Sequence, residues 1–200
     1  MNMVCLDLEG VLVPEIWIEF SKATGIPELC RTTRDEPDYD KLMKFRIDIL
    51  KNNNLKLPDI QKVISTMEPL PGAIEFANAI REKTQLVILS DTFEEFAKPL
   101  MKKLSYPTLF CNSIIADKDG TVTDYKLRQP NGKKEAIKAF KSMKMRIFAA
   151  GDSFNDLAMI READAGCLFC APEQIRKDCT DLNCVDTYED LLKKINTFLN

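Results

Sequence analysis

Two carboxylates stand two residues apart where the first apolar run ends, in the segment CLDLEGVLVP. Side chains at positions i and i+2 of a strand share one face, so Asp7 and Glu9 can address one substrate. A carboxylate can attack phosphorus to form an aspartyl-phosphate, while a second one protonates the leaving oxygen and then deprotonates the incoming water. Such a pair of residues, taken alone, more often belongs to an ordinary turn. Its residue types and spacing nevertheless permit phosphoryl transfer with Asp7 as nucleophile and Glu9 as acid and base.

Polar groups also end two later apolar runs. SDT (90–92) closes the run at 85–90, and GDSFND (151–156) follows the run at 146–151. The carboxyl ends of parallel strands meet at one edge of a sheet, where ligands bind. Each group alone has an ordinary interpretation as a turn or helix cap, but their order along the chain predicts one shared site.

A carboxylate and a phosphate dianion are both negatively charged, so a positive charge must offset their repulsion before the carboxylate can attack. Mg²⁺ held by Asp7 and Asp152 would cancel it, since Mg²⁺ prefers oxygen ligands. The Ser90 hydroxyl and a lysine ammonium would hold the phosphate oxygens. Lys133 and Lys134 both open the helix before the run at 146–151, and the spacing to that helix favours Lys133.

The elements that must position these groups alternate in type along the chain, which predicts an α/β fold with a mainly parallel sheet flanked by helices. A turn signal in DKDG predicts a β-hairpin over 115–127. The predicted strands are 3–8, 85–90, 146–151 and 165–170, and the predicted helices are 72–83, 93–104, 132–143, 154–163 and 188–199.

The connection between the first two strands is far longer than the dozen or so residues that a crossover needs. It carries helical patterns at 15–24, 39–52 and 58–66 and ends in PLPG (69–72). We interpret residues 14–71 as a small helical cap inserted over the sheet edge, and residues 1–13 and 72–200 as the catalytic core.

Composition excludes several classes of protein. The 200 residues contain no histidine, which rules out Ser-His-Asp and Cys-His catalysis and His-ligated zinc. A net charge of −3 argues against nucleic-acid binding. No apolar stretch approaches the length of a membrane helix and no signal peptide is evident, so we expect a cytoplasmic protein with no membrane partner.

Seven cysteines are present, but one CxxC pair, Cys167 and Cys170, has no second ligand pair of matching spacing. Buried, reduced thiols are therefore favoured over a metal or redox site.

DLEGV, LSD, Lys133 and GDSFND, in this order, resemble the four motifs of the haloacid dehalogenase superfamily of phosphatases and phosphotransferases. The resemblance implies a Rossmannoid sheet, bound Mg²⁺, Asp7 as nucleophile and Glu9 as acid and base. It places the metal on the side chains of Asp7 and Asp152 and the backbone carbonyl of Glu9. It also implies that Asp156 lies just beyond the metal ligands and that Asn155 helps to hold the substrate.

The cap segments PEIWIEF and DYDKLMKFRIDIL resemble the phosphoserine phosphatase branch of that superfamily. This implies that Glu15 meets the substrate ammonium and Arg46 its carboxylate, a pairing that suits an amino acid. Glu9 replaces the usual Asp, and Asp91-Thr92 replaces the usual Gly-Gly. We expect Asp91 to join Ser90 in the substrate site.

These departures resemble a narrower group of bifunctional phosphoserine phosphatases/phosphoserine:homoserine phosphotransferases, which implies phosphoserine as donor and homoserine as a possible acceptor. Three alternatives stay open. They are a phosphatase of another small metabolite, a phosphate-accepting signalling module and a non-catalytic homologue. Oligomeric state is not predicted.

Overall fold

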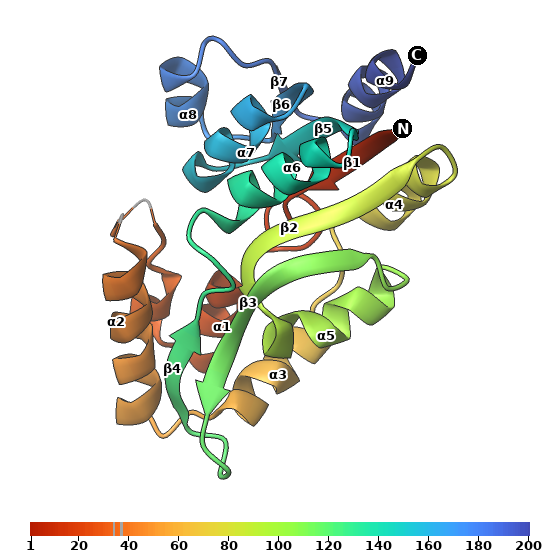
Figure 1. The fold of residues 1–200 in the computed structure, drawn as a ribbon. Helices are drawn as coiled ribbons and strands as arrows, with labels where there is room; N and C mark the ends of the chain where they lie inside the picture. Colours follow the sequence, from red (N-terminus) through yellow and green to blue (C-terminus); the bar gives the residue numbers. More distant parts are fainter. Residues whose placement is uncertain (34, 37) are drawn as a thin grey trace.

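The computed structural model describes residues 1–33, 35–36 and 38–200. A seven-stranded sheet runs through its centre in the order β4-β3-β2-β1-β5-β6-β7 (Figure 1). Neighbouring strands are parallel, except for the antiparallel pair β3 and β4. The mainly parallel α/β prediction is confirmed. The strands are β1 (Asn2–Leu6), β2 (Gln85–Phe93), β3 (Thr108–Ala116), β4 (Val122–Lys126), β5 (Arg146–Gly151), β6 (Ala165–Phe169) and β7 (Cys184–Val185).

Helices cover both faces of the sheet. The α-helices are α1 (Ile16–Thr24), α2 (Tyr39–Asn52), α3 (Leu57–Thr66), α4 (Ala73–Arg81), α5 (Glu94–Lys103), α6 (Gly132–Ser142), α7 (Leu157–Glu162), α8 (Glu173–Asp178) and α9 (Tyr188–Leu199). Two 3₁₀ turns, η1 (Pro27–Cys30) and η2 (Phe154–Asp156), complete the set within the described ranges.

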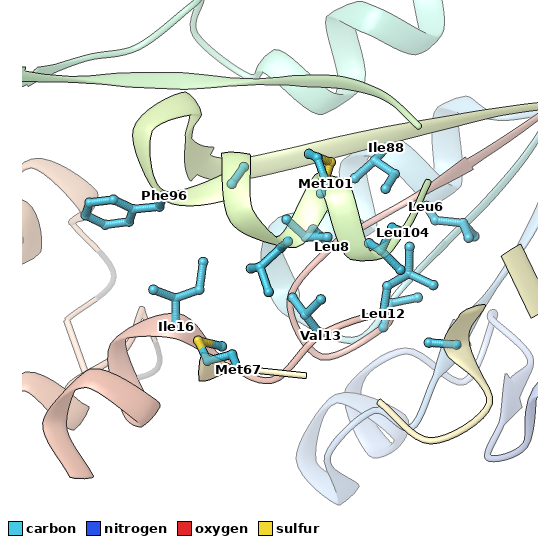
Figure 2. Packing of buried hydrophobic residues seen from close by; sticks show 14 of the residues in the cluster. Leu6, Leu8, Leu12, Val13, Ile16, Met67, Ile88, Phe96, Met101 and Leu104 are labelled. Carbon is cyan, nitrogen blue, oxygen red and sulfur yellow. The ribbon is translucent and has the colours of Figure 1, made fainter. Parts of the chain in front are cut away.

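The strands form because their apolar runs bury both faces. Alternate residues of β1 enter two separate clusters: Val4 and Leu6 pack with α4, α5 and α9, whereas Met3 and Cys5 pack with α6, α7 and α8. Figure 2 shows the first cluster, in which Leu6 lies near residues of β2 and α5. Strands that are buried on both faces have continuous apolar sequences, and for this reason they could be predicted from the sequence.

The helical insertion after β1 comprises α1, η1, α2 and α3, and its predicted helices match closely in position. It docks on the β3–β4 hairpin, since Leu57 N donates to Gly120 O (2.8 Å) and Tyr125 OH donates to Asp40 Oδ1 (3.0 Å). α2 runs beside β4 in Figure 1. The bounds 14–71 for a separate cap stay a prediction.

Some elements were not predicted. The hairpin prediction covered only the end of β3, whose first half pairs in parallel with β2. The short α8 and the two-residue β7 were also missed, because neither is long enough to show a period. None of the helices in the described ranges is both long and apolar enough to cross a membrane.

Candidate active site

The carboxyl ends of β1, β2 and β5 line one cavity together with residues of α1 and α2 of the insertion. The strand ends therefore meet as the parallel topology requires. Among the residues lining the cavity are the predicted Asp7, Glu9, Glu15, Arg46, Ser90, Asp91, Lys133, Asp152 and Asn155.

Asp7 stands one residue beyond β1, where its backbone N–H still donates to Ala150 O of β5 (3.0 Å). Its side chain is buried, and its Oδ1 accepts a hydrogen bond from Leu8 N at 2.8 Å. Burial raises the pKa of Asp7 well above its usual range; Asp156 and Asp152 add to the rise, while Lys133 opposes it. A carboxylate in this position needs positive charge beside it to stay ionised.

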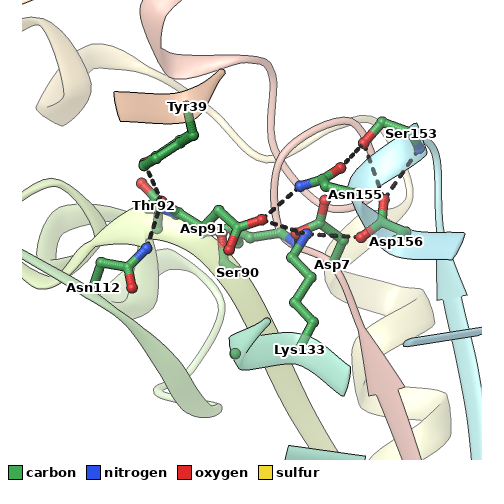
Figure 3. A network of polar contacts seen from close by, with 12 residues as sticks. Asp7, Tyr39, Ser90, Asp91, Thr92, Asn112, Lys133, Ser153, Asn155 and Asp156 are labelled. Carbon is green, nitrogen blue, oxygen red and sulfur yellow. Dashed lines mark hydrogen bonds and ion pairs between the residues drawn. The ribbon is translucent and has the colours of Figure 1, made fainter. Parts of the chain in front are cut away.

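Lys133 supplies that charge. From the first turn of α6, its buried Nζ lies 2.9 Å from Asp7 Oδ1 and 2.7 Å from Asp156 Oδ1 (Figure 3). Burial by itself would lower the pKa of Lys133, but these carboxylates outweigh it and raise the pKa well above its usual range. The neighbouring Lys134 is partly exposed and faces Glu162 at 3.9 Å. Of the two lysines, the geometry places Lys133 in the cavity.

Three buried carboxylates form a cluster, and two of them, Asp7 and Asp156, contact this lysine. One oxygen from each of Asp7, Asp152 and Asp156 lies within 4.8 Å of the others. Asp156 is already engaged, because its Oδ1 accepts from Lys133 and its Oδ2 accepts from the backbone N–H groups of Asp152 and Ser153 (3.1 Å each). Both carboxylate oxygens of Asp156 are thus held by donors of the protein itself.

The donor set fits a hard divalent cation. Buried carboxylates that repel one another are favourable only when a positive charge lies between them. Gly10, at φ +75°, makes room for this arrangement, because a Cβ there would lie 2.5 Å from Asp152 Oδ2. A side chain at position 10 would press on the Asp152 carboxylate.

We expect Mg²⁺ to raise the melting temperature of the protein, because it binds carboxylates that the unfolded chain does not bring together. At a concentration about 100 times its Kd, the gain is about 2.7 kcal/mol, or about 5–10 °C in Tm for a chain of this size. Thermal unfolding with and without Mg²⁺ measures the shift. Asp152→Asn should lose it and the exposed control Asp48→Asn should keep it, whereas an undiminished shift in Asp152→Asn would place the cation elsewhere.

Glu9 joins the sheet edge to the insertion. Its Oε2 accepts a hydrogen bond at 2.8 Å from the backbone N–H of Ile16, the first residue of α1. Burial raises the pKa of Glu9, and the Ile16 N–H, Arg46 and Thr92 oppose that rise. A raised carboxyl pKa suits a group that must both give and take a proton near neutral pH.

The end of β2 leaves the regular sheet. Its register with β3 shifts between Leu89 and Phe93, which frees the intervening residues to line the cavity. The Ser90 hydroxyl accepts a hydrogen bond from Thr92 N at 3.2 Å. The Asp91 carboxylate accepts one from Asn155 Nδ2 at 2.6 Å and lies 3.7 Å from Lys133 Nζ.

Arg46 reaches the cavity from α2 and is almost fully buried. Its Nη2 donates to Arg31 O (2.7 Å), and its guanidinium carbon lies 4.6 Å from the centre of the Trp17 ring. In the described part of the chain, no acceptor lies within hydrogen-bond reach of its buried Nε. Burial lowers the pKa of Arg46 to about 10, and Tyr39, Glu9 and Glu15 oppose this. Arg46 is thus a buried cation that lines the cavity, and a guanidinium in such a place suits an anion.

Sequence reasoning missed several residues of this site. Trp17, Tyr39 and Thr92 line the cavity, and the buried Asn112 donates to the backbone of Asp91. One signal was available, because Tyr39 lies seven residues before Arg46 and so shares its face of the helix. Nothing local to the sequence marks Asn112.

The sequence of this chain matches known proteins over most of its length. The profile of the haloacid dehalogenase-like hydrolases matches residues 1–164. The chain is 54% identical over 194 residues to the phosphoserine phosphatase of Pseudomonas syringae pv. tomato, covering 97% of this chain and 82% of that protein. It is also 54% identical over 194 residues to phosphoserine phosphatase ThrH of Pseudomonas aeruginosa, covering 97% and 95%.

The fold also matches solved structures. A phospho-aspartyl intermediate analogue of phosphoserine phosphatase aligns with a TM-score of 0.80 at 22% identity, over 96% of this chain and 98% of that one. At this identity the similarity concerns the fold.

Proposed function

This chain belongs to the haloacid dehalogenase-like hydrolase family, and from that premise we propose that it is a cytoplasmic, Mg²⁺-dependent phosphoserine phosphatase that can also pass the phosphoryl group to homoserine. The relatives at 54% identity are phosphoserine phosphatases, which supports the donor substrate. The observation that carries the proposal is a buried Asp7–Lys133 pair that shares one cavity with the buried guanidinium of Arg46.

The first step is attack of an Asp7 oxygen on phosphorus, with departure of the serine oxygen. The Lys133 ammonium and the Ser90 hydroxyl hold the phosphate oxygens. Both groups stabilise the negative charge that builds up on these oxygens in the transition state. Glu9 gives its proton to the leaving serine oxygen. Asp7 and Asp152 would hold Mg²⁺, with the Glu9 carbonyl as a further ligand; when bound, this cation neutralises the repulsion between Asp7 and the phosphate dianion.

The second step regenerates the enzyme. Glu9, now ionised, takes the proton from water or from the homoserine hydroxyl, and that oxygen attacks phosphorus while the bond to Asp7 breaks. Either acceptor follows the same chemistry, because each presents a hydroxyl to the same acyl phosphate. The acceptor is therefore selected by what fits beside Glu9.

The head group of the substrate faces the insertion. Arg46 would bind the serine carboxylate, and Glu15 would bind its ammonium. Asp91 and Asn155 would complete the substrate site from the ends of β2 and β5, with Asp156 holding Lys133 in place.

A screen of phosphate release over phosphorylated amino acids, sugars and nucleotides tests the donor substrate. We expect O-phospho-L-serine to have a far higher kcat/KM than the sugar phosphates and nucleotides, because it presents both a carboxylate and an ammonium to the cavity, a combination that those compounds lack. Faster turnover of a phosphosugar or nucleotide would show that another metabolite is the substrate.

Addition of homoserine to phosphoserine and Mg²⁺ should yield phosphohomoserine beside inorganic phosphate, because homoserine carries the same head group as serine. Mass spectrometry measures both products in one reaction. Homocysteine, whose thiol replaces the hydroxyl, is a matched control that should leave inorganic phosphate as the sole phosphorus-containing product. If inorganic phosphate forms but phosphohomoserine does not, the protein is a hydrolase that does not transfer phosphate to homoserine.

A further inference from the structure

The peptide group between Asp91 and Thr92 is held in an unusual way. Three residues of β2, from Ser90 to Thr92, stand opposite one residue of β3, so the regular ladder does not fix this stretch. Two side chains take its place. Tyr39 OH donates to the carbonyl oxygen of Asp91 at 3.0 Å, and Asn112 Nδ2 donates to the same oxygen at 3.1 Å. Both lone pairs of this carbonyl are therefore used.

Fixing this carbonyl fixes the direction of the next N–H. The Asp91 carbonyl and the Thr92 N–H belong to one planar trans peptide group and point to opposite sides. The Thr92 N–H points to Ser90 Oγ, 3.2 Å away, on the side of the buried cavity. Tyr39 and Asn112 thus set the orientation of an amide and a hydroxyl that face the place where phosphate would bind.

The two donors come from different parts of the molecule. Asn112 belongs to β3 of the core, and its Oδ1 accepts from the backbone N–H of Arg128, in the loop that leads to α6. Tyr39 is the first residue of α2 in the insertion, where the Asp38 side chain caps the helix by accepting from Asp40 N and Lys41 N. The start of α2, and with it the Tyr39 hydroxyl, is fixed relative to the end of β2 (Figure 3).

We propose that Tyr39 is a positioning residue of the phosphate site, so that the helical insertion helps to orient the groups that hold the phosphoryl group as well as binding the head group. The inference rests on the proposed phosphoryl-transfer function. Tyr39 and Arg46 lie on one helix face, seven residues and about 10.5 Å apart along the axis. One helix therefore reaches the phosphate end of the cavity with Tyr39 and its head-group end with Arg46. Tyr39 does not itself contact the reacting atoms, because its hydroxyl donates its hydrogen bond to the Asp91 carbonyl.

Tyr39→Phe tests this role, since it keeps the ring and removes the hydroxyl. We expect kcat to fall about tenfold on both O-phospho-L-serine and p-nitrophenyl phosphate, less than the 10²–10³-fold loss that follows removal of a direct donor. KM for phosphoserine should stay within about twofold, because Arg46 and Glu15 are untouched. Inhibition by orthovanadate, which binds as phosphate does in the transition state, should weaken by a similar factor.

Tyr125→Phe is the matched control. The Tyr125 ring packs edge-on against Tyr39 at 5.6 Å, and its hydroxyl also joins the insertion to the core, but it donates to Asp40 and not to the end of β2. We expect its kinetics to stay within about twofold of wild type. Asn112→Ala, which removes the other donor to the Asp91 carbonyl, should reproduce the loss in kcat and in vanadate inhibition if it folds.

Three results would overturn the inference: unchanged kcat and vanadate inhibition in Tyr39→Phe, a rise in the KM for phosphoserine as its sole effect, or an equal loss in Tyr125→Phe. A wild-type protein that fails to use phosphoserine would instead overturn the proposed substrate. The measurements with p-nitrophenyl phosphate and vanadate need no amino-acid head group, so they still decide the role of Tyr39 in that case.

Discussion

Asp7→Asn is expected to abolish phosphate release from every substrate, with a fall in kcat on the order of 10⁴-fold or more, as for loss of a catalytic nucleophile elsewhere. The neutral amide cannot form the acyl phosphate, although it keeps the shape of the side chain. Acid-quenched wild-type protein should carry the added mass of one phosphoryl group during turnover, and the variant should not. Intact-protein mass spectrometry and phosphate release measure the two effects.

The loss should not come from unfolding. Asp7 is buried beside Asp152 and Asp156, and this raises its pKa, so the substitution removes a like charge from a crowded cluster. Lys133 keeps its 2.7 Å contact with Asp156. We therefore expect the melting temperature without Mg²⁺ to stay equal or to rise. Substantial turnover in Asp7→Asn, or a phosphoryl group on another residue, would exclude the covalent mechanism at this position.

The residues at the strand ends were predictable from the sequence for a physical reason. Parallel strands buried on both faces show as apolar runs, and their carboxyl ends meet at one edge. Asp7, Ser90 and Asp152 follow such runs, so their convergence needed no knowledge of long-range contacts. Lys133 was harder to separate from Lys134, because the two are adjacent in sequence and only packing buries one of them.

The groups that orient the end of β2 were not predictable in this way. Asn112 and Tyr39 act through hydrogen bonds to a backbone carbonyl that lies 21 and 52 residues away along the chain. A backbone acceptor leaves no mark in the sequence, and Asn112 sits in the half of β3 that showed no clear pattern. The Asn112 contact follows only once the register of β2 and β3 is known, and the Tyr39 contact only once α2 is docked on the core.

Asp91 lies where the sequence predicts, but its polar groups are already engaged within the protein. Its position after Ser90 predicted a place in the substrate site, and it does line the cavity. Its carboxylate, however, accepts a hydrogen bond from Asn155, and its carbonyl accepts from Tyr39 and Asn112. A direct contact between Asp91 and the substrate stays a prediction.

Arg46→Ala should separate head-group recognition from chemistry. A hydrogen bond to a charged group contributes about 1.5–3 kcal/mol, so the kcat/KM for O-phospho-L-serine should fall about 10–100-fold, mainly through KM. For p-nitrophenyl phosphate, which has no carboxylate on the head-group side, kcat/KM should stay within about threefold. Arg46→Lys keeps the charge but loses the fork of donors, so its effect on phosphoserine should be intermediate.

Removal of Arg46 also removes its contacts with Arg31 O and with Trp17, so a loss of packing must be distinguished from a loss of binding. Arg31→Ala is the matched control, because it removes a cation of the insertion that packs on Phe45, yet keeps the carbonyl that Arg46 uses. Its kinetics should match wild type. A similar loss on both substrates in Arg46→Ala would contradict the head-group assignment.

Trp17 offers a direct measure of the same interaction, because it is the one tryptophan in the sequence and its ring lies 4.6 Å from the Arg46 guanidinium. A carboxylate that binds Arg46 changes the charge above the indole ring, so phosphoserine should shift the fluorescence of the Asp7→Asn variant, which binds without turnover. Addition of Arg46→Ala to that variant should weaken the apparent Kd about 10–100-fold. Because no phosphoryl group is transferred in either variant, this difference reports ground-state binding alone; an unchanged Kd would show that the carboxylate of the substrate binds elsewhere.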